Sequence, residues 1–374
     1  MLTMEKSDLS ELFSRIEDPR VGENSRFPLN EIIFLTMAAN LSGVESWRGV
    51  EIFGIERLDS LRLYFPFEFG IPSRLTISRV FSLINPIFFE SFLKEVAQAI
   101  EPVSNSKVIA IDGKTLRGTS ACRKTRFHTL NAVAVDSGIS FGQVPCPENG
   151  NENSAMPYLL DSLDLKGATI TADAAHCNHA TAQKIIEKKA DFVLAVKRNQ
   201  KALHEEVERI FEESGLHEGD AISYTETLEK GHGRLERRRY QVAYLSDTLR
   251  KTWKEANSVA MVVSDVTRNE VTNSQVRYFI SSILPDPKRI AHAIRGHWSV
   301  ENRLHWTLDV VFEEDRSLKR KDNAPRNFAA LRKIVMNTIR GFLKSTQGVK
   351  HARMRAAWNP LHMMKLLNYL ASHF

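Results

Sequence analysis

The stretch Val108-Ile109-Ala110-Ile111-Asp112-Gly113-Lys114 is an apolar run that leads into an acidic residue. A second run, Ala168-Thr169-Ile170-Thr171-Ala172-Asp173-Ala174, does the same. Short apolar runs of this kind predict buried β-strands. Because reactive groups of α/β proteins gather where strands leave the sheet, we expect Asp112 and Asp173 to lie in one site. For either aspartate alone, capping of the turn after the strand is the better interpretation, and only the pair favours a shared site.

Strands and helices alternate around these two runs. Strands are predicted over 107–112, 127–135, 139–144, 168–173 and 191–196, and helices over about 153–163 and 178–189. The sequence Asp136-Ser137-Gly138 predicts the turn of a hairpin between the second and third strands. The order βββαβαβ predicts an α/β fold, with a mixed sheet that is flanked by helices. Asp191 begins its strand, so we expect it at the opposite edge of the sheet from Asp173.

Helical patterns precede this sheet, and strand patterns return after it. Apolar residues recur at helical spacing over 28–39, 72–81 and 88–100, which predicts a helical N-terminal domain over residues 1–103. A second domain, 104–374, would hold the sheet together with a β-rich insertion at about 215–284. The polar start of the helix at 72–81 either caps that helix or touches a DNA backbone, and capping is the favoured interpretation.

The composition excludes several classes of protein. The chain has 374 residues, a formal net charge of +6 and three cysteines. A mild basic excess is compatible with a polyanionic partner without proving one. Cys122, Cys146 and Cys177 form no C-x-x-C pair, which argues against a disulfide framework and a cysteine-type zinc site. The sequence has no run of about 18 apolar residues and no signal-peptide pattern, so we expect a cytoplasmic protein without a membrane span.

A third acidic residue lies on a helix that we predict over about 288–308. His297, Glu301 and His305 recur every four residues and share one face of this helix, beside an apolar stripe. Glu301 is therefore the candidate for a third carboxylate. A transition-metal site built from the two histidines and Glu301 is less favoured, because the chain lacks a motif such as H-E-x-x-H.

Other residues of this helix offer alternatives. Asp309 and Glu313 lie one or more turns farther on and are the other candidates for the third acid. Trp298 and Trp306 either stack on a flipped base or pack in the core. Core packing is the favoured interpretation, because large aromatic side chains are usually buried.

The three acids point to one kind of chemistry. Carboxylates from distant segments form the ligand set that two hard divalent cations need for phosphoryl transfer. Carboxylate oxygens suit Mg²⁺, whereas cysteine selects softer metals. Two cations about 4 Å apart would neutralise a phosphodiester, activate the attacking hydroxyl and stabilise the leaving oxygen. Asp112, Asp173 and Glu301 together therefore predict metal-dependent cutting and joining of nucleic acid.

Longer motifs surround the acids and run in order along nearly the whole chain. They are Ile111-Asp112-Gly113-Lys114-Thr115-Leu116-Arg117-Gly118, Thr171-Ala172-Asp173-Ala174, the stretches 190–200 and 230–238, and Arg295-Gly296-His297-Trp298-Ser299-Val300-Glu301-Asn302-Arg303-Leu304-His305-Trp306 with the residues up to Asp315. Residues 7–97 look like an N-terminal transposase-associated domain. With these motifs the chain resembles DDE-class transposases of bacterial insertion sequences, specifically the H-repeat-associated (H-rpt) group.

The resemblance implies an RNase H-like catalytic domain with a β-rich insertion. It implies Asp112, Asp173 and Glu301 as the catalytic triad, binding two Mg²⁺ ions, with Mn²⁺ as an alternative. The implied activity is transposition, in which DNA is cleaved and joined at insertion-sequence ends. The partners would be element terminal repeats and target DNA, with a homodimer during synapsis, and the location would be the nucleoid.

Two departures from the family pattern keep other functions open. Related transposases carry Tyr, Arg, Glu and Lys on the helix of Glu301, and here Ile294, His297 and Leu308 occupy the other three positions. The stretch 148–154 also differs from the expected Asn-Glu-Lys-Ser-Asn-Glu run. The alternatives are a catalytically degenerate DNA-binding remnant and a host nuclease that cuts without joining. The intact triad favours an active transposase.

Basic and amide residues near the acids and in the insertion are the candidates for DNA binding, because phosphate contacts supply much of the affinity. They are Lys114, Arg117, Lys197, Arg198, Asn199, Arg234, Arg237, Arg238, His297 and Arg303. For each cluster taken alone, a solvated surface is the alternative. Lys197 and Arg198 are the strongest candidates, since they follow a strand at its carboxyl end.

Overall fold

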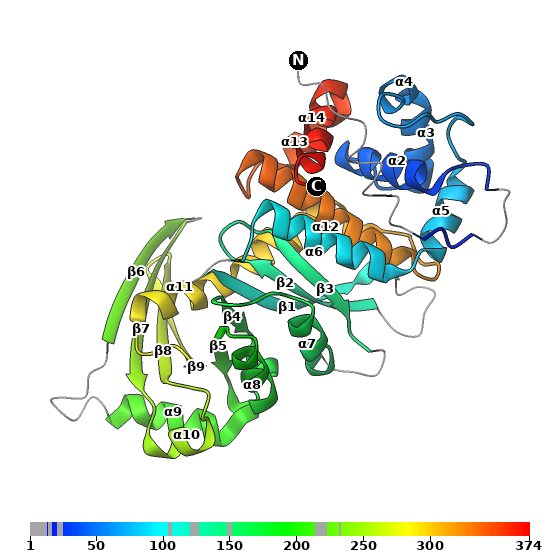
Figure 1. Cartoon of the computed structure of the whole chain (residues 1–374). Helices are drawn as coiled ribbons and strands as arrows, with labels where there is room; N and C mark the ends of the chain where they lie inside the picture. The colour runs from blue at the N-terminus through cyan, green and yellow to red at the C-terminus, as the bar shows by residue number, and fades with distance from the viewer. Residues whose placement is uncertain are drawn as a thin grey trace.

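One continuous sheet runs through the chain (Figure 1). The computed structural model describes residues 13, 17–20, 25–103, 107–119, 127–147, 152–213, 223–231 and 233–374. Over these residues the sheet has nine strands in the order β3-β2-β1-β4-β5-β9-β8-β7-β6. The strands are β1 (Val108–Leu116), β2 (Phe127–Ala134), β3 (Ser140–Pro145), β4 (Thr169–Ala172), β5 (Asp191–Val196), β6 (Ser223–Gly231), β7 (Arg234–Tyr244), β8 (Ser258–Arg268) and β9 (Val271–Ser281).

The first five strands form the predicted mixed sheet. β1 pairs antiparallel with β2 and parallel with β4, and β4 pairs parallel with β5. β2 and β3 form the hairpin, whose turn places Gly138 at φ +71°, a value that glycine adopts without steric strain. Helices α7 (Glu152–Asp161) and α8 (His179–Glu187) follow β3 and β4. The prediction of an RNase H-like sheet flanked by helices is confirmed.

The β-rich insertion extends this sheet. β9 pairs antiparallel with β5 over Val193–Val196, and β8, β7 and β6 continue outward as antiparallel neighbours. Figure 1 shows these strands at one end of the molecule, with α9 (Lys201–Glu213) and α10 (Asp247–Thr252) beside them. The insertion is therefore attached to the first five strands by the pairing of Val193–Val196 with residues 278–281.

Side chains of β1 alternate between two packed faces of the sheet. Val108 and Ala110 belong to one apolar core, and Ile109 and Ile111 belong to the other. The first core also holds residues of α6 (Pro86–Ile100), α11 (Pro287–His297) and α12 (Ala324–Leu343), and the second holds residues of α7 and α8. Since successive strand residues face opposite sides, this alternation directs Asp112 toward the α11 face and Gly113 toward the α7 face.

The N-terminal helices share the first core with the C-terminal helices. The helices are α2 (Leu29–Leu41), α3 (Trp47–Glu56), α4 (Leu58–Leu61) and α5 (Arg74–Leu83) before α6, and α13 (Val349–Trp358) and α14 (Pro360–Ala371) after α12. α12 packs along α6 and α5, and Figure 1 shows the blue and red ends of the chain on the same side of the sheet. Ser73 Oγ accepts a hydrogen bond from the Thr76 backbone N–H, so the capping interpretation is confirmed.

Two predicted boundaries are wrong at the segments that carry the acids. β1 continues to Leu116 because residues 113–116 pair with residues 127–130 of β2, so Asp112 lies within its strand and not at the end. The helix predicted over about 288–308 begins at Pro287 as expected, but its regular α-helical part, α11, ends at His297, and π-helical turns over Glu301–His305 and Thr307–Val311 follow. Among the described residues no helix combines the length and apolar character that crossing a membrane requires.

Candidate metal centre

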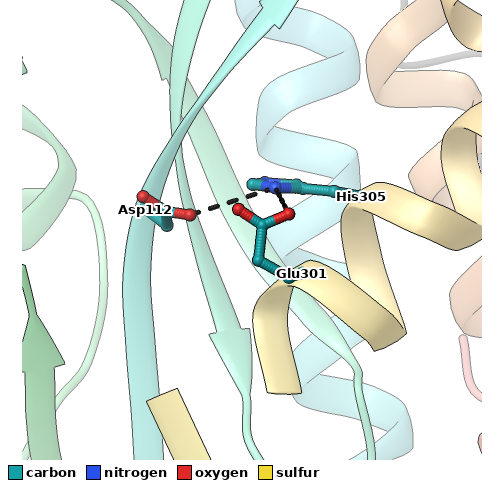
Figure 2. A group of neighbouring side chains, drawn as sticks. All are labelled: Asp112, Glu301 and His305. Atoms are coloured by element: carbon teal, nitrogen blue, oxygen red, sulfur yellow. Dashed lines mark hydrogen bonds and ion pairs between the residues drawn. The ribbon is translucent and has the colours of Figure 1, made fainter. Parts of the chain in front are cut away.

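Asp112, Glu301 and His305 come together between β1 and the helix that covers it (Figure 2). One potential ligand atom from each residue lies within 4.8 Å of the other two. His305 Nδ1 is 3.2 Å from a Glu301 carboxylate oxygen and 3.9 Å from an Asp112 carboxylate oxygen. Residues from distant parts of the sequence therefore supply one cluster of metal-ligand atoms.

The helix that carries Glu301 and His305 is held close to the sheet. Gly296 permits this approach, because a Cβ at that position would collide with the Val135 side chain. Val300 and Leu304 are buried beneath the helix. In the π turn that follows, the Trp306 N–H donates to the Glu301 carbonyl, and such turns are frequent at functional sites. The buried apolar stripe thus fixes which face Glu301 presents to Asp112.

Asp173 directly follows β4, the strand that neighbours β1. The parallel pairing of β1 and β4 ends at Ile111 and Ala172, so the two aspartates are the next residues on adjacent strands. Asp173 Oδ1 also accepts a hydrogen bond from the Ala175 N–H at 2.9 Å, which caps the turn after β4. In the described part of the chain its carboxylate does not belong to the 4.8 Å group. The structure brings Asp112 and Glu301 together and leaves Asp173 one strand away.

The environment of Asp112 disfavours its ionised form. Burial raises the pKa of Asp112 to about 7, and the negative charges of Glu301, Glu152 and Asp173 act in the same direction. A hydrogen bond from the Gly113 N–H opposes this rise. Because burial and like charge both penalise the carboxylate, the pocket favours binding of a proton or a cation at neutral pH.

The imidazole of His305 is in the form that binds metals. Burial lowers the pKa of His305, and the nearby charge of Lys114 lowers it further, so the ring is neutral at pH 7. His305 Nε2 is buried and has no hydrogen-bond partner among the described residues. Carboxylates suit Mg²⁺ and Mn²⁺, and imidazole suits transition metals. The donor set of Asp112, Glu301 and His305 therefore fits a divalent cation, and the histidine adds a ligand that a set of three acids lacks.

Lys114 and Asp309 form an interior ion pair. Lys114 is 7% exposed, and its Nζ lies 2.7 Å from Asp309 Oδ1 and 3.8 Å from a Glu314 oxygen. Asp309, one of the two alternatives for the third acid, is thus engaged by a lysine of the chain. A DNA phosphate would have to compete with this carboxylate for Lys114.

His297 and Arg303 make contacts that dock the helix. His297 Nδ1 is 2.6 Å from Thr171 Oγ1, and the Arg303 guanidinium donates hydrogen bonds to the carbonyls of Val135 and Asp136. Burial lowers the pKa of His297, so its ring carries no charge for a phosphate at neutral pH. Both residues hold the helix on the sheet, whatever further contact they make with DNA.

The two tryptophans of this helix lie at the surface. Trp298 and Trp306 are 52% and 55% exposed, so the favoured prediction that they pack in the core is wrong. The apolar stripe of the helix is filled by smaller side chains, which leaves both indole rings on the other face. Arg277 lies over the Trp298 ring at 5.4 Å from its centroid.

Two of the predicted DNA-binding residues are exposed at the carboxyl end of β5. Lys197 and Arg198 follow that strand, and neither forms an ion pair within the described residues. Asn199 Nδ2 donates to the Ala174 carbonyl at 2.9 Å, which ties this turn to the segment after Asp173. Arg117 is also exposed, with its Nε 3.5 Å from an Asp315 oxygen. These residues surround the same edge of the sheet as the aspartates.

The arginines of the insertion face carboxylates of the same hairpin. Arg237 Nε lies 2.7 Å from a Glu226 oxygen, and Arg234 Nη2 lies 3.6 Å from a Glu236 oxygen. Arg238 pairs with Glu236 as well. Exposed ion pairs contribute little net stability, so exchange of the Glu226 partner of Arg237 for a DNA phosphate costs little. The Arg238–Glu236 pair is 13% exposed on both sides and is less accessible. The DNA contact of all three arginines stays a prediction.

Sequence reasoning missed three residues on the opposite face of β1. Glu152, His128 and His176 form a hydrogen-bonded cluster against Gly113. The only signal was the departure from the family pattern at 148–154, of which residues 148–151 lie outside the described residues. A glutamate and two histidines so far apart show no periodicity that would connect them.

Asp112→Asn is expected to stabilise the protein when no divalent cation is present. The folded-state pKa of Asp112 is raised to about 7 from about 3.9 in an unfolded chain, so the folded protein keeps a proton that the unfolded chain releases. The free energy of unfolding of the wild type therefore falls between about pH 4 and pH 7, and asparagine lacks this loss. Denaturant unfolding at pH 8 should show the variant more stable by roughly 1–3 kcal/mol, with little difference at pH 4.

Asp136→Asn is the matched control, because that side chain is 68% exposed. It should change stability by less than about 0.5 kcal/mol across the same pH range. Equal stability of the wild type and Asp112→Asn at pH 8 would show that the Asp112 carboxylate is not under electrostatic strain.

Family models match both parts of the chain. A model described as "Transposase DDE domain" matches residues 104–338. A model described as "DDE_Tnp_1-associated" matches residues 10–96. The first match includes Asp112, Asp173 and Glu301, so the residues of the candidate metal centre lie within the matched region.

Similar proteins extend over the whole chain. "Putative transposase YncI" of Escherichia coli O157:H7 is 37% identical, over 97% of this chain and 95% of that protein. "H repeat-associated putative transposase YhhI" of Escherichia coli strain K12 is 36% identical, over 99% of this chain and 98% of that protein. "Inactive transposase YbfQ" of the same strain is 42% identical over 21% of this chain and 94% of its own length. On the family match and the full-length similarity, the chain belongs to the DDE-class transposases, in the H repeat-associated group.

Proposed function

We propose that the protein is an active, metal-dependent DNA transposase that cleaves phosphodiester bonds at insertion-sequence ends and joins those ends to target DNA. The observation that carries this proposal is the approach of Asp112, Glu301 and His305 to within 4.8 Å of one another. Asp112 lies on β1, which pairs with β4, the strand that leads into Asp173. The Glu301 side chain is 60% exposed and that of Asp112 is 25% exposed. Carboxylates that repel one another in this way gain from a bound cation.

The chain's own residues would hold the metal ions and shape the site. Asp112 and Glu301 are the proposed ligands, with His305 beside them and Asp173 completing the set from the adjacent strand. When bound, Mg²⁺ or Mn²⁺ would neutralise the phosphodiester and activate the attacking hydroxyl. The attacking group would be water during cleavage and a DNA 3′-hydroxyl during joining, without a covalent bond between DNA and protein.

DNA would approach along the edge of the sheet where the aspartates lie. Lys197, Arg198 and Arg117 are the proposed phosphate contacts nearest the site, because all three are exposed there. The arginines of the insertion would extend this surface. Synapsis of two element ends would bring two copies of the chain together, so we propose a homodimer during the reaction. A protein acting on chromosomal DNA would work at the nucleoid, in the cytoplasm.

Two observations keep the remnant hypothesis as the second candidate. His297 and Leu308 stand at the basic positions of the family's helix signature, and both side chains face the protein interior. A relative that matches a fifth of this chain is named an inactive transposase. Cleavage and joining assays separate this remnant, a host nuclease and an active transposase.

Substitution of the three acids should abolish catalysis and leave DNA binding intact. Asp112→Asn, Asp173→Asn and Glu301→Gln each remove a ligand charge, so Mg²⁺-dependent cleavage and strand joining should both fall to background. The assay uses purified protein and DNA that carries the terminal repeats flanking its own gene, with gel analysis of nicked and joined products. Asp164→Asn, a change of the same kind on an exposed residue, is the control and should retain activity.

The outcomes of this assay are distinct. Binding without cleavage by the wild type would identify a DNA-binding remnant. Cleavage without joining would identify a nuclease. Full activity of any of the three acid variants would remove that residue from the proposed metal site.

Removal of Lys197 and Arg198 should weaken DNA binding in a salt-dependent manner. The double variant Lys197→Ala/Arg198→Ala loses two phosphate contacts, so the slope of log affinity against log salt should fall by roughly 2. Fluorescence anisotropy with terminal-repeat DNA at several salt concentrations measures this slope. Arg209→Ala on α9, which breaks ion pairs with Glu206 and Glu213, serves as the control for lost surface charge. An unchanged slope in the double variant would place the DNA path elsewhere.

A further inference from the structure

A glutamate and two histidines form a cluster on the face of β1 opposite the candidate metal centre. Glu152 Oε1 lies 2.8 Å from His128 Nε2, and Glu152 Oε2 lies 3.0 Å from His176 Nε2. The outer nitrogens are engaged too, His128 Nδ1 by Thr115 Oγ1 at 2.8 Å and His176 Nδ1 by Asn153 Oδ1 at 3.0 Å. Each imidazole is therefore oriented by contacts on both of its nitrogens.

The cluster touches the two segments that carry the catalytic aspartates. A Cβ added at Gly113, the residue after Asp112, would collide with the Glu152 carboxylate and with the His128 ring. His176 belongs to the 3-10 turn Ala174–His176, and Asp173 caps that turn. Glu152 thus packs against the backbone beside Asp112 and is hydrogen-bonded to the turn that begins at Asp173.

The carboxylate of Glu152 is stabilised in its ionised form. Hydrogen bonds from His128 and then His176 lower the pKa of Glu152 to about 2, against the opposing effect of burial. His176 is 1% exposed, so loss of its acceptor would leave a buried N–H without a partner. The three residues hold one another in a single arrangement.

The cluster is not itself a preformed metal site. Within the described residues the three side chains do not offer three ligand atoms within 4.8 Å of one another, as Asp112, Glu301 and His305 do. The carboxylate instead spans the gap between the two rings. A bridge of this kind fixes the distance between the elements at its two ends.

We propose that Glu152 is a positioning residue of the metal centre: by bridging His128 on β2 and His176 after β4, it locks β1 to the Asp173 turn and sets the separation of Asp112 and Asp173. The inference rests on the proposed function, because it takes these aspartates to be ligands of shared cations. Groups that orient the ligands of a metal site, without touching the metal, commonly change its affinity by 10- to 100-fold.

Direct metal binding by two variants tests this role. Glu152→Gln keeps the size of the side chain but replaces one acceptor oxygen by a donor, and Glu152→Asp keeps the charge but shortens the reach. We expect both to weaken Mn²⁺ binding at least 10-fold in calorimetric titrations of the full chain, with circular dichroism spectra like the wild type. Glu90→Gln is the matched control, since it breaks an ion pair with Arg326 away from the site, and it should bind Mn²⁺ within twofold of the wild type.

Each result supports or overturns the proposal. Wild-type Mn²⁺ affinity in Glu152→Gln would overturn the proposal. Wild-type Mn²⁺ affinity in Glu152→Asp alone would overturn it too, because the negative charge would then be enough without the position of the carboxylate. If Glu152→Gln does not fold, His128→Gln replaces it as the test, because this variant removes one arm of the bridge at a half-buried residue. It should show the same loss of Mn²⁺ affinity, and a normal Mn²⁺ affinity in His128→Gln would overturn the proposal. Failure of the proposed function looks different, because Asp112→Asn would then bind Mn²⁺ as well as the wild type does.

Discussion

The structure depends on a carboxylate, that of Asp112, whose ionised form is disfavoured by its surroundings. Asp112 is held under the helix of Glu301 by the alternation of β1, and burial together with the charges around it raises its pKa to about 7. The surrounding cores, the close approach at Gly296 and the π turns all serve to bring Glu301 and His305 onto that carboxylate. A bound divalent cation would relieve the repulsion, and it would be the same cation that the proposed phosphoryl transfer needs.

A chain of buried charges connects this centre to the N-terminal helices. Lys114, two residues after Asp112, pairs with Asp309 and lies near Glu314, which in turn lies 3.7 Å from Arg332 on α12. Arg332 and Arg353 both bind Glu45, in the loop between α2 and α3. Breaking one partner of a buried pair leaves an uncompensated charge. The N-terminal helices are therefore fixed to the catalytic sheet by charge as well as by the apolar core they share.

The sequence predicted those features that depend on local pattern. Strand 191–196 is found as β5 (Asp191–Val196), because a short apolar run between turns has few other solutions. The end of β1 was misjudged, since Gly113-Lys114-Thr115 looks like a loop and becomes a strand only through its pairing with β2. Trp298 and Trp306 were wrongly predicted to be buried, because the average burial of tryptophan does not say which face of a helix packs against the core. The contacts of Glu152, and the approach of His305 Nδ1 to Asp112, arise from tertiary packing, which no spacing along the chain encodes. The domain boundaries and the roles of the site residues remain predictions.

The central claim is that Asp112 and Glu301, with Asp173 alongside, bind divalent metal in one pocket. Anomalous diffraction from crystals of the full chain soaked in Mn²⁺ tests it most directly. The account predicts a manganese peak about 2–2.5 Å from carboxylate oxygens of both Asp112 and Glu301. A map with both side chains ordered and no peak between them, at saturating Mn²⁺, would contradict the account.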